Sequence, residues 1–325
     1  MNSAAFWHTV LARLDAGTPL FVALVVANTR GSPGTLGARI LVDADGNTFG
    51  TIGGGIMEAN LVRMARKGLR AGNDAPPALQ PLEHRNKPGT AHPSGLICAG
   101  EQTNLHCWLT PERDAATIRE FCAALVAEDD AIANLLIDAN GLRVTYDHDT
   151  GMQLSLDGTR WCWRESSVNE DRLAIVGGGH CGKALARLAA DIGYRVEVFD
   201  TRADALGLDA DWPAGVRRHV LADYALLPAR LHWPALTTVA VMTAAITQDI
   251  AALAVLANAG AHWLGVMGSV AKIHEIRTQL AARGIAQERI DAIRGPIGLP
   301  MKSDTPPEIA VSIMAQLLAE RRAVT

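Results

Sequence analysis

The chain contains 325 residues, 49% of them apolar and 20% charged, and carries a formal net charge of −4 at pH 7. This length predicts two domains, and the composition is typical of a soluble protein. The charge excludes a global basic field for nucleic acid or an anionic membrane, and no apolar run is typical of a membrane span. A polar N-terminus without a signal peptide, and five cysteines without C-x-x-C spacing, favour a reduced, cytoplasmic protein.

The first half of the chain predicts a mixed set of strands and helices. Helices are expected at 4–14, 56–72 and 112–127. Strands are expected at 19–29, as a pair within 38–52, and at 102–109, 132–137, 142–146, 152–156 and 160–164. The proline-rich stretch 73–97 is expected to form a long loop. We place the domain boundary in the polar stretch 164–172, which gives an N-terminal domain 1–168 and a C-terminal domain 169–325.

The second half alternates short apolar strands with helices, which predicts a doubly wound parallel sheet. Strands are expected at 173–177, 195–199, 217–221, 237–243, 262–267 and near 296–299. Helices are expected at 180–192, 247–258, 270–283 and 306–322. The predicted fold class is therefore α/β, with a Rossmann-like C-terminal sheet and a separate α+β N-terminal domain.

The stretch LAIVGGGHCGKALA at 173–186 has G-x-G-x-x-G spacing between a strand and a helix. Its glycines are Gly177, Gly179 and Gly182, and Asp200 ends the next strand 18 residues later. In this context the glycines let a pyrophosphate approach the backbone at the start of a helix. Asp200 would bond a ribose hydroxyl and favour NAD over NADP. A Rossmann domain with an empty or repurposed cleft is the alternative.

Other side chains could extend this turn. His180 could contact a phosphate or only cap the turn. Gly268 and Ser269 end a later strand just before a helix, at the edge where ligands bind in open sheets. Lys272, one turn further, could reach an anion or stay solvated, and Arg202 is expected to be a surface charge. The acid/base pair that hydride transfer requires is not evident in this half.

A second glycine turn, FGTIGGGIMEAN at 49–60, lacks the dinucleotide spacing. We interpret Gly53, Gly54 and Gly55 as a cradle of free amides for an oxyanion at the start of a helix. Glu58 lies in the first turn of that helix, and Arg39 lies on the strand before it. These five residues are candidate ligand-binding residues of the N-terminal domain.

The ordered motifs resemble one family over most of the chain. They are GSPGTLGARILV, GTIGGGIMEA, GLICAG, LAIVGGGHCGKALA, VEVFDTR, LGVMGSVAK and GPIGLPMKSDTPPEIAVSIMAQLLAERR, as in the xanthine dehydrogenase accessory factor (XdhC/CoxI) family. The resemblance implies a chaperone, usually a homodimer, that is not itself an enzyme. It implies that the protein binds molybdenum cofactor, as molybdopterin or its dinucleotide, and protects it during sulfuration by a cysteine desulfurase. It also implies delivery to a molybdenum hydroxylase apoenzyme.

Within this resemblance, the two glycine turns would face one cleft and hold the cofactor's phosphate, and the Cys98 thiolate could ligate molybdenum or lie near a sulfur donor. The chain departs from the usual family residues at four positions, which are Gly34, Ala99, Thr110 and Ala245. The departures mark either a branch with a different client or a protein without cofactor handling. Two other functions stay open: an NAD-binding regulatory module and an NAD-dependent oxidoreductase.

Overall fold

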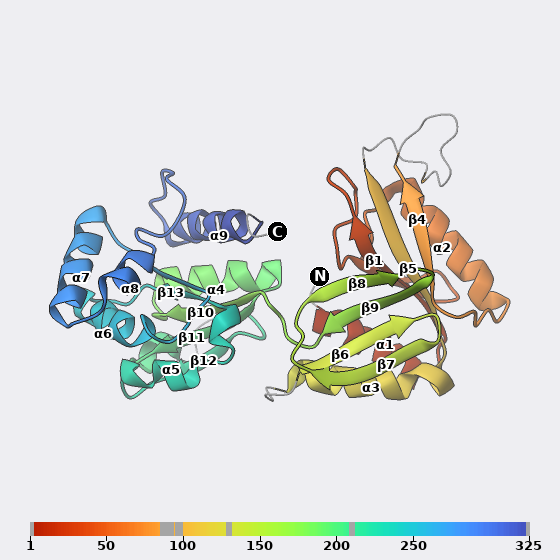
Figure 1. Ribbon diagram of the computed structural model, residues 1–325, viewed down its shortest axis with the longest axis horizontal. Helices are drawn as coiled ribbons and strands as arrows, with labels where there is room; N and C mark the ends of the chain where they lie inside the picture. The colour runs from red at the N-terminus through yellow and green to blue at the C-terminus, as the bar shows by residue number, and fades with distance from the viewer. Residues whose placement is uncertain (1–2, 85–93, 95–99, 128–131, 208–211, 323–325) are drawn as a thin grey trace. The chain divides into compact units, whose positions relative to one another are not determined.

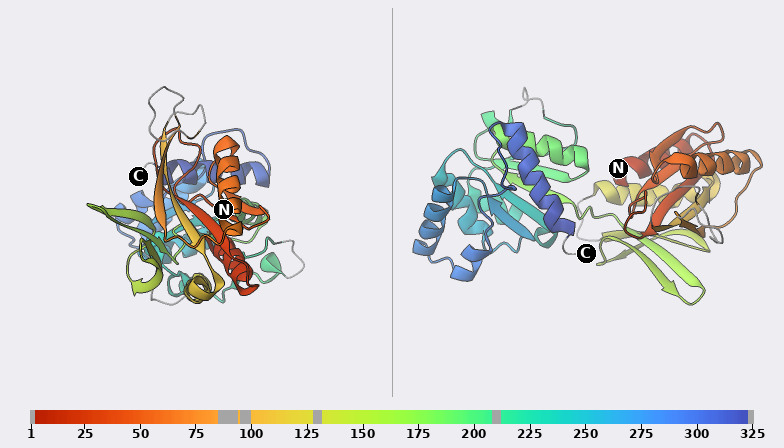
Figure 2. Two further views of the ribbon diagram at one scale, coloured as in Figure 1. Left: turned by 90° about the vertical axis from the view of Figure 1, so that its right-hand side faces the viewer. Right: turned by 90° about the horizontal axis from the view of Figure 1, so that it is seen from above.

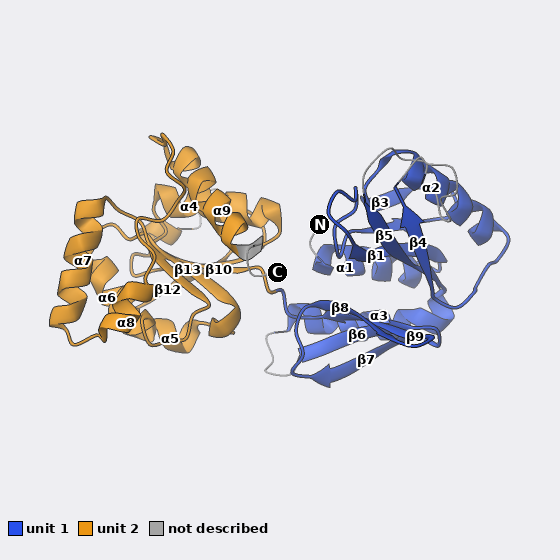
Figure 3. Ribbon diagram, turned by 45° about the horizontal axis from the view of Figure 1, so that its top comes forward, with its two compact units in different colours: residues 1–169 blue, residues 170–325 orange. Residues whose placement is uncertain are grey.

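The computed structural model describes residues 3–84, 94, 100–127, 132–207 and 212–322. The chain forms two compact units, residues 1–169 and 170–325 (Figure 3). The division falls one residue from the boundary that the polar stretch 164–172 suggests.

Among the residues described, unit 1 contains two antiparallel sheets and three helices (Figure 1). The first sheet has the order β3-β2-β1-β5-β4 and is formed by β1 (Leu20–Asn28), β2 (Arg39–Val42), β3 (Thr48–Thr51), β4 (Ala78–Glu83) and β5 (Glu101–Leu109). The second has the order β7-β6-β9-β8 and is formed by β6 (Ile132–Asp138), β7 (Gly141–Asp147), β8 (Met152–Asp157) and β9 (Arg160–Ser166). The helices are α1 (Ser3–Asp15), α2 (Gly55–Arg70) and α3 (Pro111–Val126).

Strand β1 is buried on both faces, because helices cover the first sheet from either side. Alternate side chains such as Leu20 and Val22 pack with α1, α3 and the second sheet in one apolar cluster. The intervening Phe21 and Ala23 pack against α2 on the opposite face. This two-sided burial explains why an uninterrupted apolar run forms a strand in an antiparallel sheet, where one solvated face is more usual.

The long loop predicted at 73–97 is wrong in part, because a piece of it forms a strand. β4 pairs antiparallel with β5, from Ala78 opposite His106 to Glu83 opposite Glu101. β4 lies at the edge of its sheet. A proline such as Pro81 is tolerated there, since an edge strand need not donate every backbone hydrogen bond.

Unit 2 contains a five-stranded parallel sheet in the order β12-β11-β10-β13-β14, which confirms the predicted Rossmann-like class. Its strands are β10 (Arg172–Val176), β11 (Arg195–Asp200), β12 (Arg217–Val220), β13 (Thr237–Val241) and β14 (Trp263–Val266). The first strand along the chain, β10, is central, with β11 on one side and β13 on the other. The topological switch point, where ligands bind in such sheets, therefore lies between the carboxyl ends of β10 and β13.

Helices cover both faces of the parallel sheet (Figure 2). α4 (His180–Ile192) and α9 (Pro306–Arg322) lie side by side on one face, where Leu185 and Ile313 join one apolar cluster. The opposite face is covered by α6 (Ile246–Leu256) and α7 (Val270–Ala282), through side chains such as Ile250 and Ile273. Two short helices that the sequence does not predict are α5 (Leu227–Arg230) and α8 (Gln287–Ala292). In the described part of the chain, no helix has the length and apolar character needed to cross a bilayer.

The strand predicted near 296–299 is wrong. Instead, Arg294 forms an isolated parallel bridge with Gly265 of β14. The amide of Arg294 donates to the carbonyl of Leu264, and its own carbonyl accepts from the amide of Val266. The amide of Ile297 still donates to the carbonyl of Val266 at 3.2 Å, so the chain follows the β14 edge from Arg294 to Ile297 without forming a regular strand.

Candidate functional site

The glycine turn of unit 2 occupies the switch point and connects β10 to α4. A Cβ atom on Gly177 would lie 2.3 Å from the carbonyl oxygen of Met242, and one on Gly182 would lie 2.0 Å from the carbonyl oxygen of Gly177. Gly177 also has a φ of +122°, which side-chain-bearing residues rarely adopt. These two glycines are therefore required by the packing of the turn against β13 and α4.

Gly179 differs from Gly177 and Gly182, because a Cβ atom there would meet no heavy atom of the described residues within 4 Å. The first hydrogen bond of the α4 ladder runs from the amide of Lys183 to the carbonyl of Gly179. The amides of His180, Cys181 and Gly182 therefore precede the ladder, at the positive end of the helix dipole. An uncovered backbone beside these amides fits an anionic group such as a phosphate. The exposed His180 lies at the same helix start.

Asp200, the predicted ribose partner, is 1% exposed and already bonded to protein groups. Its carboxylate accepts the amide of Gly178 at 2.8 Å and bonds Arg202 through both the backbone amide and the guanidinium, at 2.9–3.1 Å. Burial alone raises the pKa of Asp200, but the hydrogen bonds from Arg202 and Gly178 outweigh burial and hold that pKa below its ordinary value. Asp200 therefore holds the glycine turn in place, and Arg202, whose side chain is 37% exposed, is a surface charge that pairs with it.

A buried ion pair lies beside the same turn, at the carboxyl ends of β13 and β14. Asp249 of α6 is 0% exposed and accepts hydrogen bonds from the amide and the hydroxyl of Thr243, at 3.0 and 2.7 Å. The ammonium of Lys272 lies 2.5 Å from the other Asp249 oxygen. A Cβ atom on Gly177 would lie 3.0 Å from the Cα of Thr243, so this cluster borders the switch point.

Gly268 and Ser269 follow β14 at the carboxyl edge of the sheet, and both help to position Lys272. The Ser269 hydroxyl accepts the amide hydrogen of Lys272 and caps α7. A Cβ atom on Gly268 would lie 2.6 Å from the Cδ of Lys272, so the lysine stem folds over a backbone that only glycine leaves uncovered. The pairing of Lys272 with Asp249 is not apparent in the sequence. The one sequence signal is that each residue lies in the first turn of a helix, and that these helices, α6 and α7, follow the neighbouring strands β13 and β14.

The glycine turn of unit 1 is not the cradle of free amides that the sequence suggests. One Glu58 oxygen accepts the amide of Ile52 at 3.0 Å, the amide of Gly54 at 3.1 Å and the hydroxyl of Thr51 at 2.7 Å. The amide of Gly53 donates to the same threonine hydroxyl. The turn therefore contains an anion from its own helix, which occupies the place expected for an external oxyanion.

Arg39, the second charged candidate in unit 1, is buried within a structural network. Its guanidinium lies 2.6 Å from Glu165, and both side chains are 2% exposed. The same guanidinium donates to the carbonyl of Gly37 and lies over the ring of Phe6. The prediction that Arg39 contacts a ligand is wrong for this arrangement, because the pair joins β2 to β9 inside the unit.

His84 connects motif segments of unit 1, and the sequence alone does not single it out. It is 0% exposed, and its ring nitrogens lie 2.7 Å from the Ser94 hydroxyl and 3.4 Å from the Ser32 hydroxyl. Because Ser32 donates to Gln102, Nε2 of His84 carries the hydrogen and Nδ1 accepts from Ser94. The His84 amide donates to the carbonyl of Gly100, so this residue bonds a residue on each side of the 95–99 segment.

Gln102 completes this network by connecting the segment at Gly34 to the glycine turn that begins at Ile52. Its carbonyl oxygen accepts the amide of Gly34 at 3.1 Å, and its amide nitrogen donates to the carbonyl of Ile52 at 3.2 Å and to Asn104 at 2.7 Å. A Cβ atom on Gly34 would lie 2.5 Å from the Ile52 carbonyl oxygen, so the space at this position suits glycine and not a larger residue. Alternating polar residues on β5 were the one sequence signal for this network.

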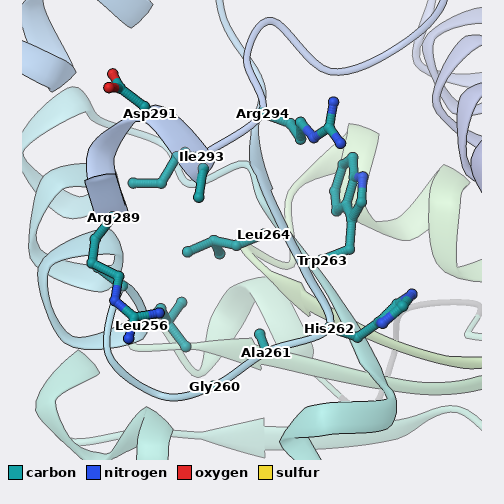
Figure 4. A pocket seen from close by; sticks show the side chains of 12 residues that line it. Leu256, Gly260, Ala261, His262, Trp263, Leu264, Arg289, Asp291, Ile293 and Arg294 are labelled. Atoms are coloured by element: carbon teal, nitrogen blue, oxygen red, sulfur yellow. The ribbon is translucent and has the colours of Figure 1, made fainter. Parts of the chain in front are cut away.

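A cavity of about 400 Å³ opens in unit 2 at the amino end of β14, opposite to the edge that carries the glycine turn. Figure 4 shows Leu264 and Ile293 pointing into it, with Arg289 and Arg294 at its rim. None of the residues that the sequence predicts for a ligand site contributes to its lining. This cavity is therefore separate from the switch point.

Cys98, the predicted thiolate ligand, lies outside the described residues, and so does Ala99. Within the described part of the chain, no group of three histidine, cysteine or acidic side chains is arranged to hold a metal ion. Burial raises the pKa of Cys122 to about 12 and that of Cys107 still further, so neither of these thiols is a reactive alternative to Cys98.

Comparison with known proteins identifies the family of both units. Residues 173–317 match the XdhC Rossmann domain, and residues 13–79 match the XdhC and CoxI family. The chain is 25% identical over 310 residues to the uncharacterized protein YqeB of Escherichia coli (strain K12), which covers 95% of this chain. It spans 45% of the length of that relative.

A solved structure of a xanthine dehydrogenase from Bacillus halodurans is similar in fold. The TM-score is 0.73 and the identity is 21%, with 100% of this chain and 97% of that chain covered. At this identity the similarity concerns the fold alone. The two family matches lie in the same order as the motifs of the two units, and the chain therefore belongs to the XdhC and CoxI family.

Proposed function

We propose that this protein is a maturation factor that holds molybdenum cofactor during sulfuration and delivers it to a molybdenum hydroxylase of the xanthine dehydrogenase type. Membership of the XdhC and CoxI family supports this role. The single observation that supports it best is Gly179, whose backbone is uncovered at the start of α4 and at the switch point of the sheet. In this role the protein is a carrier rather than an enzyme.

The part of the cofactor that this site suits is its phosphate, or its pyrophosphate in the dinucleotide form. The backbone at Gly179 and the first amides of α4 would bind that group. Because Glu58 fills the turn of unit 1, we assign the phosphate to unit 2 and not to two equivalent cradles. When bound, the cofactor supplies the molybdenum centre, for which Cys98 stays the predicted ligand. A cysteine desulfurase, a hydroxylase apoenzyme and a second copy of the chain are the proposed partners.

Pterin retention tests this function. The protein is purified gently from cells that make the cofactor, the bound pterin is oxidised with acidic iodine, and its fluorescence is measured per mole of protein. We expect near-stoichiometric pterin in the wild type and little in Gly179→Val, which inserts a side chain where the ligand approaches. Ala286→Val places a valine at the corresponding N-cap position of α8 and serves as the control. Absence of pterin from the wild type in cofactor-rich cells would contradict the proposal.

Cys98→Ser is the second variant in this assay. We expect it to reduce cofactor retention or activation of the client enzyme while leaving the unfolding temperature unchanged. If Cys98→Ser retained the cofactor and activated the client enzyme as well as the wild type does, Cys98 would not be a ligand. That result would not affect the proposed phosphate site of unit 2.

An NAD-binding regulatory module is the second candidate, because the switch-point turn has the dinucleotide spacing and lies where dinucleotides bind. Against it, both oxygens of Asp200 are bonded to Arg202 and Gly178, so a ribose would have to displace existing bonds. Tight NAD binding by a protein that retains no pterin would select this candidate. Turnover of NADH with small aldehydes would instead identify an oxidoreductase.

A further inference from the structure

Lys272 has a position that the proposed function does not by itself require. Its ammonium carries three hydrogen-bond donors. The ammonium forms an ion pair with Asp249 at 2.5 Å, and one of its donors bonds the carbonyl of Met267 at 3.1 Å. The third donor has no partner among the described residues, and the side chain is 25% exposed. The lysine is thus held in place while it keeps one donor for a ligand.

The buried carboxylate explains how the lysine is held. Asp249 is fully buried and charged, so it requires strong compensation, which the two Thr243 hydrogen bonds and Lys272 provide. The stem of Lys272 folds back over Gly268, where a larger residue would displace it. A solvated lysine loses considerable side-chain entropy when it binds an anion, whereas this one is already ordered.

The cluster of Thr243, Asp249 and Lys272 lies at the same edge of the sheet as the glycine turn, but it follows different strands. The turn follows β10, Thr243 follows β13, and Lys272 follows β14. Neighbouring strands are about 4.8 Å apart, so the ends of β10 and β14 are about 10 Å apart. The start of α4 and the Lys272 ammonium are therefore two separate donor groups along this edge, and a diphosphate offers one phosphate to each.

We propose that Lys272 anchors the second phosphate of a diphosphate-bearing ligand whose first phosphate lies on the α4 start. The ligand class of the crevice is then a nucleoside-diphosphate-like group, and the dinucleotide form of the cofactor is preferred over the mononucleotide form. This inference rests on the proposed function only in taking the switch point as the ligand site. Asp249 and Thr243 are positioning residues in this arrangement, because they act through Lys272.

The test uses ADP and AMP as probes, with affinities measured by isothermal titration calorimetry on the full chain. Wild type should bind ADP about tenfold more tightly than AMP, the effect of one additional charged hydrogen bond. Lys272→Met should reduce ADP affinity to the AMP level and change AMP affinity by less than about twofold. Lys302→Met, at an exposed lysine of the same unit, is the matched control and should change neither.

Two further variants separate position and folding from charge. Lys272→Met leaves Asp249 buried without its partner, which could prevent folding. In that case the double variant Lys272→Met with Asp249→Asn, which removes both charges, is measured instead. Gly268→Ala keeps the ammonium but displaces its stem, and should lose the preference for ADP as well. The inference would be overturned if the wild type bound ADP and AMP equally, or if Lys272→Met lost affinity for both equally. Either result would still support a nucleotide site at the switch point. If the wild type bound neither nucleotide, both the role of Lys272 and the ligand site at the switch point would be overturned.

Discussion

The carboxylate of Glu58 accepts the amide hydrogen of Gly54 at 3.1 Å, so the glycine turn of unit 1 is neutralised by its own helix. The same oxygen accepts the amide of Ile52, three positions before the helix begins. A phosphate at this turn would have to displace a tethered carboxylate. The two glycine turns of this protein therefore have different roles, one closed by an internal acid and one open at Gly179.

Replacing Glu58 should convert the closed turn into an open one. Glu58→Ala leaves two backbone amides without their acceptor, which should reduce the free energy of unfolding by about 1–2 kcal/mol. The freed amides should then bind phosphate, so sodium phosphate should stabilise the variant more than the wild type when compared with sodium chloride of equal ionic strength. Urea unfolding in both salts measures this difference.

The matched control for that experiment is Glu308→Ala. Glu308 also accepts two backbone amides at a helix start, those of Asp304 and Thr305, but in a turn without consecutive glycines. Phosphate should not stabilise this variant preferentially. An equal phosphate effect in the two variants would show that the Glu58 turn has no special affinity for anions.

The glycines at the switch point should separate into packing and ligand-binding positions. Gly177→Ala places a Cβ atom 2.3 Å from the Met242 carbonyl oxygen at a φ of +122°, and should destabilise unit 2 by more than about 2 kcal/mol. Gly179→Ala adds a Cβ atom that meets no heavy atom of the described residues within 4 Å, so it should leave the unfolding temperature unchanged while it weakens AMP binding. Calorimetric unfolding and titration measure both effects, and a Gly179→Ala protein with wild-type affinity would remove Gly179 from the site.

The ion pair between Arg39 and Glu165 should contribute to stability and not to ligand binding. Arg39→Met leaves a buried carboxylate unpaired and should cost about 3–5 kcal/mol, whereas Arg39→Met with Glu165→Gln should recover most of that loss. Urea unfolding measures the difference. Loss of pterin from the double variant at near-wild-type stability would instead restore Arg39 as a ligand-binding residue.

His106 should make unit 1 sensitive to mild acid. Burial lowers the pKa of His106 from 6.5 to about 4, and its Nε2 atom is buried without a hydrogen-bond partner among the described groups. Between these two pH values the unfolded chain binds a proton that the folded chain excludes, so stability is complete above about pH 6.5 and declines as the pH falls towards 4. At about 1.4 kcal/mol per pH unit, the loss is on the order of 3 kcal/mol.

His106→Phe keeps an aromatic ring beside Phe21 and removes the titrating group. The stability difference between pH 7 and pH 4.5, measured by urea unfolding, should therefore be smaller in the variant than in the wild type. An identical pH dependence in the two proteins would place the acid sensitivity at other groups.

The elements of the fold follow largely from local patterns along the chain. The predicted helix at 180–192 has the bounds of α4, and the alternation of short strands and helices predicted the parallel sheet. The strand β4 was not predicted, because it depends on a partner strand and not on its own residues. Pro81 counts against a strand unless an edge position is available, and only the completed sheet provides that position.

Side-chain partners could not be predicted in this way, because they join residues that are distant in sequence. The glycine spacing located the turn at 177–182, but its neighbours Asp249 and Lys272 meet only because β13 and β14 end at one edge of the sheet. Arg39 and Glu165 are 126 positions apart and meet through the packing of two sheets. Periodicity and glycine spacing are properties of a local segment, so the sequence was sufficient for them. Which charges are neutralised, and which backbone amides stay free for a ligand, depends on contacts that exist only in the folded chain.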